Sequence, residues 1–252
     1  MPNKLAEEGR AAPGEDQLRI AGITPFTTID FPGKLAAVAF LQGCPWKCVY
    51  CQNVWMQPRD FDPAFEHSSW AALHALLMRR QGLLDGVVFS GGEPCLDPAL
   101  PAAVKAVKAL GYAVGLHTGG AYPRRLAEII GDLDWIGLDV KAPPDDDAHW
   151  TRIVQVKGAS ARWAESFEII RASGVPFECR TTAHPDFLSE ASLLRLADRL
   201  ADAGADTFAL QLYRRPPGQQ FALFPAVGSD YPSPELESAL RARFARFTIR
   251  RS

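Results

Sequence analysis

The chain has 252 residues and a mass of 27.5 kDa, enough for one large or two small domains. Hydrophobic residues make up 47% and charged residues 22%, so the composition excludes a wholly disordered or collagen-like chain. Twenty-seven basic and twenty-nine acidic side chains give a net charge of −2. This balance offers no electrostatic case for direct binding of nucleic acid.

The first residues have the composition of a tail. Residues 1–17 carry six charged side chains and lack the apolar core of a signal peptide. No apolar run in the chain approaches the ~18 residues needed to cross a bilayer. We therefore expect a cytoplasmic protein without membrane association, with a flexible tail over residues 1–17. Residues 18–252 then form one core domain that ends in a C-terminal helix.

From residue 35 onward, short apolar runs alternate with segments of helical periodicity. The runs that we interpret as strands are Ala36–Gln42, Gly86–Ser90, Tyr112–His117, Asp134–Val140, Val175–Thr181 and Thr207–Leu212. Apolar residues at helical spacing predict helices around Trp70–Leu77, Trp163–Ile170, Leu193–Leu200 and Pro234–Phe247.

This alternation predicts an α/β fold with parallel strands and right-handed crossovers. No Gly-x-Gly-x-x-Gly follows the first strand, so the dinucleotide-binding fingerprint is missing. In the fourth predicted strand Asp139 and Lys141 share one face, and in the fifth Arg180 lies opposite Cys179. A polar face turned toward an interior favours a partial (β/α)6 TIM-like barrel over an open sheet covered on both sides.

Three of the five cysteines are closely spaced directly after the first strand. Cys44, Cys48 and Cys51 form a C-x3-C-x2-C motif on a loop where β/α barrels carry their active sites. Three thiolates on a [4Fe–4S] cluster leave one iron open for another ligand. A structural zinc site is the alternative, and it would need a fourth ligand; the next histidine is His67.

A second motif, Gly91-Gly92-Glu93-Pro94, follows the second predicted strand. Together with the cysteine motif it resembles the radical S-adenosylmethionine (SAM) superfamily. The resemblance implies a partial barrel of the radical SAM type and a [4Fe–4S] cluster held by the three cysteines. It also implies that SAM binds at the open iron, with its amino group held by the Gly91–Pro94 motif. Tyr50, inside the cysteine motif, is also expected to bind the cofactor.

Further segments resemble the activating enzymes of glycyl-radical enzymes. Residues 30–33, Asp-Phe-Pro-Gly, are similar to the lead-in of anaerobic ribonucleoside-triphosphate reductase activating proteins, and we expect residues 28–34 to form part of the active-site rim. Asp139-Val140-Lys141 resembles an activase Asp-x-Lys motif, which makes Asp139 and Lys141 candidate SAM contacts. Arg180-Thr181-Thr182 with His184-Pro185 resembles the activase pattern after the fifth strand, which makes Arg180 a further candidate. An interior salt bridge between Asp139 and Lys141 is the alternative, and Glu178 is an alternative partner for Arg180. Gln52 departs from the histidine common at that position in activases.

The resemblance implies reductive cleavage of SAM to a 5′-deoxyadenosyl radical, which generates a glycyl radical on anaerobic ribonucleotide reductase. An electron donor such as flavodoxin or ferredoxin is then required. The alternatives are another glycyl-radical enzyme as partner, a small-molecule substrate such as a modified-nucleoside precursor, or a non-enzymatic metal-binding module. The two remaining cysteines, Cys95 and Cys179, are too few for a second cluster. The roles of Cys95, His117, His184 and Gln211 stay open.

Overall fold

The protein is described by a computed structural model over residues 12–214 and 224–251. Its strands form one sheet in chain order, from β1 at one edge to β8 at the other. β1 is antiparallel to β2, and every other neighbouring pair is parallel. The strands are β1 (Ile20–Thr27), β2 (Ala36–Leu41), β3 (Gly86–Gly91), β4 (Ala113–Thr118), β5 (Trp135–Asp139), β6 (Phe177–Ala183), β7 (Thr207–Leu212) and β8 (Arg246–Arg250).

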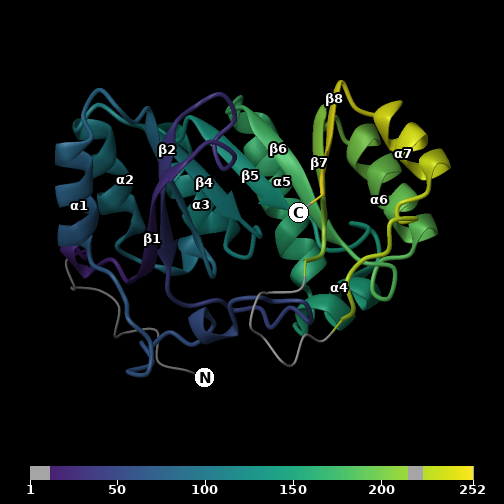
Figure 1. Ribbon diagram of the computed structural model, residues 1–252, viewed down its shortest axis with the longest axis horizontal. Coiled ribbons are helices and arrows are strands. Elements are labelled where there is room, and N and C mark those ends of the chain that lie inside the picture. Colours follow the sequence, from purple (N-terminus) through teal and green to yellow (C-terminus); the bar gives the residue numbers. More distant parts are fainter. Residues whose placement is uncertain (1–11, 215–223, 252) are drawn as a thin grey trace.

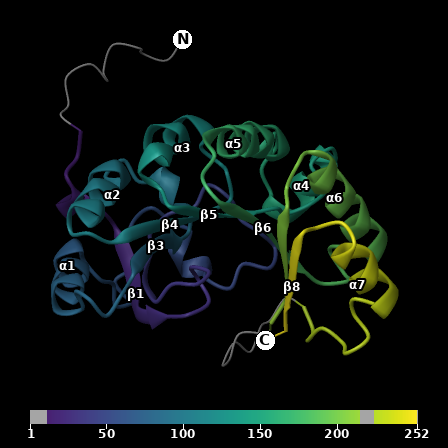
Figure 2. The ribbon, with the colours of Figure 1, turned by 90° about the horizontal axis from the view of Figure 1, so that it is seen from above.

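Seven helices lie along the convex side of this curved sheet, so the strands form an open arc rather than a closed barrel (Figures 1 and 2). They are α1 (Trp70–Arg79), α2 (Leu100–Ala109), α3 (Pro123–Ile129), α4 (Asp147–Val154), α5 (Ala159–Ser173), α6 (Glu190–Asp202) and α7 (Pro234–Arg241). The α/β class and the partial barrel predicted from the sequence are confirmed. No helix in these described ranges is both long and apolar enough to cross a membrane.

The six predicted strands correspond to β2–β7, with ends that shift by at most two residues. Both edge strands were missed. The helix predicted over Pro234–Phe247 ends at Arg241, and Phe247 belongs to β8. Phe244 and Phe247 pack on Phe208 of β7, at ring-centroid distances of 4.9 and 6.0 Å. The helical spacing of Phe244 and Phe247 in the sequence therefore arises from their contacts with the sheet, and not from a helix that continues past Arg241.

The interior of the arc is divided into an apolar and a polar end. At the amino ends of the parallel strands, Phe31 is buried and stacks on Trp135 at 5.7 Å. Glycines make room for it, because a Cβ at Gly86 or Gly115 would lie within 3.3 Å of the Phe31 ring. Residues 28–34 therefore plug the end opposite the strand termini that carry the cysteine motif. The expectation that they form part of the active-site rim is wrong.

The predicted tail is only partly covered by the structure. Residues 1–11 lie outside the described residues, and Glu15–Gln17 form one 3-10 turn that packs against α1 and α2. The division into a tail and a core domain stays a prediction.

Candidate active site

A pocket of about 310 Å³ lies at the carboxyl ends of the parallel strands, the lower end of the molecule in Figure 1. Nine of the residues predicted from the sequence meet in its lining: Cys44, Cys48, Tyr50, Cys51, Gly91, Gly92, Glu93, Asp139 and Lys141. Two others, Pro94 and Arg180, do not line it. Pro94 is buried at the start of a 3-10 turn, and Arg180 lies behind Asp139. Their contacts with SAM stay predictions.

The cysteine loop, residues 43–53, is held by backbone hydrogen bonds from two sides. Gly43 and Cys44 donate to the carbonyls of Met56 and Gln57, at 2.7 and 2.9 Å. The amides of Lys47 and Val49 donate to carbonyls in the last turn of α4, at 3.0 and 2.9 Å. These bonds fix the loop between the turn at residues 54–57 and α4, so the three thiols enter the pocket from a restrained backbone.

The thiols occupy a desolvated environment. Burial raises the pKa of Cys44 to about 12 and that of Cys48 to about 11, while the Lys141 charge opposes the shift at both. Metal ligation requires thiolates, so a cationic centre would have to stabilise them. Among the described residues, no three His, Cys, Asp or Glu side chains are grouped to hold a single metal ion. A [4Fe–4S] cluster takes each thiolate on a separate iron, a wider arrangement.

Glu93 is a buried carboxylate at the edge of the pocket. Its Oε1 accepts from the Thr118 hydroxyl at 2.7 Å and from the Cys95 amide at 3.1 Å, and its Oε2 accepts from the Gly119 amide at 2.9 Å. Burial raises the pKa of Glu93, while the hydrogen bonds from Thr118 and Gly119 oppose that shift. The site thus holds an oriented acceptor suited to an ammonium group.

The paired glycines are required by close packing, Gly91 against β2 and Gly92 against the cysteine loop. A Cβ at Gly91 would lie 2.2 Å from the Leu41 amide nitrogen, and one at Gly92 would lie 2.2 Å from the Gly43 carbonyl oxygen. Gly91 also has a φ of +116°, which favours glycine. A ligand-binding role was predicted for these glycines, and their lack of a side chain also lets the end of β3 approach β2 and the cysteine loop.

Asp139 connects two cations inside the barrel. Its Oδ2 accepts from Lys141 Nζ at 2.9 Å, and its Oδ1 accepts from Arg180 Nε and Nη2 at 3.1 and 2.8 Å. Burial raises the pKa of Asp139, but the charges of Lys141 and Arg180 outweigh it and hold the pKa below its ordinary value. Burial likewise lowers the pKa of Lys141, yet Asp139 raises it well above normal. Asp139 and Lys141 are therefore both charged at neutral pH.

The salt bridge between Asp139 and Lys141, left open as an alternative, is present, and both residues also line the pocket. Arg180 does not pair with Glu178, which binds Arg250 of β8 at 2.8 Å. The guanidinium of Arg180 fits because residue 137 is glycine: a Cβ there would lie 2.9 Å from its central carbon.

Two buried polar atoms beside the pocket lack a hydrogen-bond partner within the described residues. They are Nε1 of Trp46 and the Tyr50 hydroxyl, and both residues line the pocket. Tyr50 stacks on Phe187 at 4.7 Å, and Lys141 Nζ lies 5.6 Å from the Tyr50 ring. Unsatisfied buried polar groups are costly, so these atoms suit a site that a polar cofactor fills. With the thiol triad and Glu93, this donor set fits an iron–sulfur cluster and SAM.

The four residues with open roles fall into two groups. Gln211 lines the pocket, together with Thr182 and the end of β7. His117 is buried, and its Nε2 pairs with the Asp30 carbonyl at 2.8 Å; burial and the Arg180 charge lower its pKa well below normal. His184 Nε2 pairs with the Pro225 carbonyl at 3.2 Å. Cys95 is buried behind Glu93.

Sequence reasoning missed Trp46, Gly119 and the residues that follow Gln211, Leu212 to Arg214, as parts of the site. A Cβ at Gly119 would lie 2.3 Å from the Trp46 ring, so this glycine seats the indole under the cysteine loop. Gly119-Gly120 directly after a strand was a signal for close approach that could have been used. The pocket residues after β7 had no motif to mark them.

Curated relatives of this chain include activating enzymes. A protein of Methanocaldococcus jannaschii that carries the provisional name glycyl-radical enzyme activating enzyme is 28% identical over 77% of this chain and 79% of its own length. The pyruvate formate-lyase-activating enzyme of Clostridium pasteurianum is 33% identical over 51% of this chain and 54% of its own.

Solved structures share the fold. QueE from Escherichia coli covers 93% of this chain and 94% of its own, with a TM-score of 0.56 and 17% identity. Streptococcus suis SuiB bound to S-adenosylmethionine covers 82% of this chain and 48% of its own, with a TM-score of 0.62 and 15% identity. The family model of the radical SAM superfamily matches residues 38–197, which contain both motifs. The chain therefore belongs to the radical SAM superfamily, whose cofactors are a [4Fe–4S] cluster and S-adenosylmethionine.

Proposed function

We propose that this protein activates a glycyl-radical enzyme, and that its target is anaerobic ribonucleoside-triphosphate reductase. The observation that carries the proposal is the pocket itself, where the thiol triad, a buried carboxylate and the Asp139–Lys141 pair meet at the strand ends of an open arc. An arc with unpaired edges can admit a loop of a partner protein, which would shield the reaction from water. The names of the two relatives reported above support an activase, and the Asp-Phe-Pro-Gly lead-in supports the reductase as target.

In this proposal each residue of the pocket has a distinct task. Cys44, Cys48 and Cys51 would hold the cluster, leaving one iron for SAM. Glu93, oriented by Thr118 and Gly119, would accept hydrogen bonds from the SAM amino group. Lys141 would face the SAM carboxylate, and Asp139 would keep Lys141 charged and fixed.

When bound, the cluster and SAM together supply a one-electron cleavage that yields methionine and a 5′-deoxyadenosyl radical able to take a hydrogen atom from glycine. The chain itself contributes binding, orientation and exclusion of water. The Trp46–Trp150 contact at 5.9 Å and the Tyr50–Phe187 stack form an apolar wall beneath the cysteine loop.

The test is to mix the reconstituted protein anaerobically with SAM, dithionite and the reductase, and to record electron paramagnetic resonance spectra. We expect a doublet from a glycyl radical on the reductase, and none with Cys48→Ala. Pyruvate formate-lyase in place of the reductase tests the other class of partner. Cleavage of SAM without a radical on either protein would contradict an activase.

A small-molecule substrate is the second candidate, and a specific feature of the pocket supports it. Thr182, Gln211 and Arg214 bring polar groups to the side of the pocket away from the glycine pair. These groups could bind a compact polar ligand such as a modified-nucleoside precursor. Stimulation of SAM cleavage by such a metabolite, with no effect of the reductase, would favour this candidate.

A further inference from the structure

The outer side of the cysteine loop carries cations that the proposed reaction does not use. We define the basic patch as Lys47 of the loop, Arg152 of α4, Lys157 after α4 and Arg162 of α5. All four side chains are exposed, and none forms an ion pair with another described residue.

The members of the basic patch are neighbours through the backbone. Lys47 donates its amide to the Val154 carbonyl at 3.0 Å, which places the loop on the last turn of α4, two residues after Arg152. The Arg162 guanidinium donates to the Lys157 carbonyl at 3.3 Å. The four cations therefore surround the junction of α4, α5 and the cysteine loop.

A groove of about 380 Å³ adjoins the patch. Val49, from the turn between Cys48 and Cys51, lines it with Arg152 and Phe187, and Phe187 stacks on Tyr50. A molecule bound in this groove would therefore contact Val49, the residue that follows Cys48. It shares no described lining residue with the active-site pocket, so both can be occupied at once.

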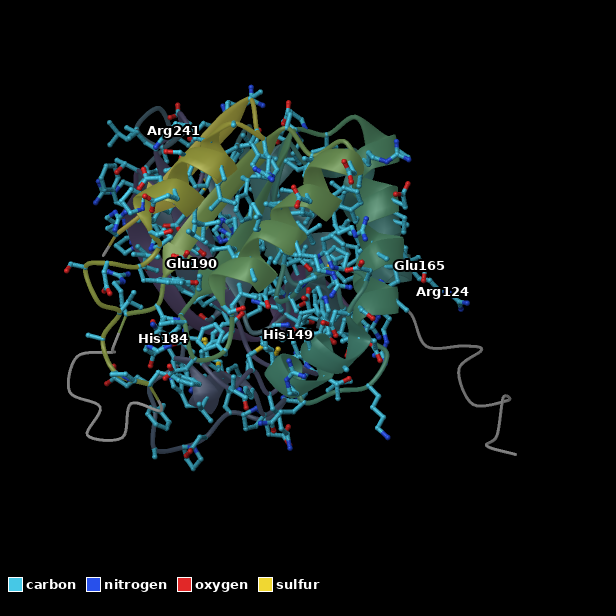
Figure 3. The ribbon with its side chains drawn as sticks, turned by 90° about the vertical axis from the view of Figure 1, so that its right-hand side faces the viewer. Arg124, His149, Glu165, His184, Glu190 and Arg241 are labelled. Carbon is cyan, nitrogen blue, oxygen red and sulfur yellow. The ribbon has the colours of Figure 1, made fainter. Side chains whose placement is uncertain are left out.

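The charge of this face differs from that of the whole chain. Arg152 and Asp186, the charged residues that line the groove, offset each other, and Lys47, Lys157 and Arg162 add positive charge beside it on a chain of net charge −2. Figure 3 shows Glu165 of α5 beside Arg124 on the flank of the molecule, away from His149 in the groove. An acidic protein would be steered toward this face.

We propose that the basic patch and its groove dock an acidic one-electron carrier of the flavodoxin or ferredoxin class. This inference rests on the proposed function, because the site at the cysteine loop must be reduced before SAM is cleaved. The carrier loses one electron for each SAM cleaved and the site gains it, without a proton or a bond being exchanged. Redox encounters use small, transient interfaces, and a groove of this size beside a charged patch suits one.

The experiment compares two pairs of charge reversals in the reconstituted protein, with reduced flavodoxin as the probe. The patch variant is Arg152→Glu/Lys157→Glu, and the matched control is Arg79→Glu/Lys105→Glu, exposed cations on α1 and α2 near the β1 edge of the sheet (Figure 1). Stopped-flow absorbance gives the second-order rate of reduction by flavodoxin hydroquinone. Calorimetry gives the affinity for oxidised flavodoxin.

At about 20 mM salt we expect the patch variant to be reduced about tenfold more slowly than the wild type, and to bind oxidised flavodoxin more weakly. At about 500 mM salt the rates should converge, and the control should stay within about twofold of the wild type throughout. The milder Arg152→Gln/Lys157→Gln variant should give an intermediate rate. Equal rates and affinities for the patch and control variants would overturn the docking site.

Dithionite separates this inference from the proposed function. This small reductant needs no docking surface, so we expect it to reduce all variants at the same rate. If dithionite supports no SAM cleavage in the wild type, the proposed function fails. If dithionite works equally in all variants and flavodoxin does not distinguish them, only the docking site fails.

Discussion

Arg180 lies behind Asp139 and does not line the pocket, so we predict that it affects SAM binding through Asp139, as a positioning residue. We predict the consequence of Arg180→Met, which keeps much of the side-chain volume and removes the charge. Two charge-assisted hydrogen bonds to Asp139 Oδ1 are lost, at 3.1 and 2.8 Å. The Asp139 carboxylate keeps its ion pair with Lys141 at 2.9 Å, and its side chain is 30% exposed to solvent, so its charge stays compensated. We therefore expect a loss of about 2 kcal/mol in the free energy of unfolding, below the ~3–5 kcal/mol for a fully stranded buried charge.

The assay is a double-mutant cycle with Asp139→Asn. Urea unfolding of Arg180→Met, Asp139→Asn and the double variant should give a coupling energy of about 1–2 kcal/mol. Anaerobic calorimetry with SAM on the same four reconstituted proteins measures the effect on binding. If Arg180 acts through Asp139, Arg180→Met should weaken SAM binding in the wild type but add no further loss to Asp139→Asn.

The positioning role of Arg180 is refuted if Arg180→Met lowers SAM affinity as strongly in the Asp139→Asn background as in the wild type. That outcome would restore the direct contact with SAM. Arg180→Lys is the matched control: it keeps the charge but not the forked geometry, so it should fall between the wild type and Arg180→Met.

Three further predictions concern the pocket. Cys48→Ala should lose most of its bound iron after anaerobic reconstitution, whereas Cys179→Ala, buried in the core, should keep it; equal iron contents would contradict the cluster assignment. Because burial raises the pKa of Glu93 above 4.5, the wild type should lose stability as pH rises through the folded-state pKa, and the non-titrating Glu93→Gln should not. Urea unfolding of both apoproteins should therefore show that the wild type loses stability relative to Glu93→Gln between pH 4.5 and pH 8. A difference in unfolding free energy that is the same at both pH values would contradict the raised pKa. Gly119→Ala forces a Cβ to 2.3 Å from the buried indole of the cysteine loop and should cost about 1–3 kcal/mol of unfolding free energy. Gly131→Ala, which meets nothing within 4 Å, should cost less than half of that, and equal losses would exclude the indole contact as the cause.

The sequence alone determined the parts of the site that depend on local spacing. Cys44, Cys48 and Cys51 lie on one loop, so their convergence needs no long-range contact. Alternation of strands and helices predicted parallel pairing, and this brings the carboxyl ends of β2, β3 and β5 together. The period of two along a strand placed Asp139 and Lys141 on the pocket side and Cys179 in the core.

The edge strands and the plug depended on tertiary contacts. β1 pairs antiparallel with β2, so it does not belong to the alternation of strands and helices that marked the parallel strands. The apolar residues of β8 gain their partners only when Phe208 of β7 lies beside them. Phe31 fills the amino end of the barrel because Gly86 and Gly115 leave space for its ring. These glycines are more than fifty residues away in the chain, so the sequence around Phe31 does not indicate that space.

The choice of partners inside the site was likewise decided by the folded structure. The alternation of side chains along the strands allowed either Glu178 or Asp139 as the partner of Arg180. The pairing of β5 with β6 sets Asp139 directly opposite Arg180. Gly137 then leaves room for the guanidinium, and Arg250 from the far edge of the sheet takes Glu178. Local sequence determines which face a side chain occupies; which charge it meets there depends on strands that are distant in the chain and on the volume that their residues leave free.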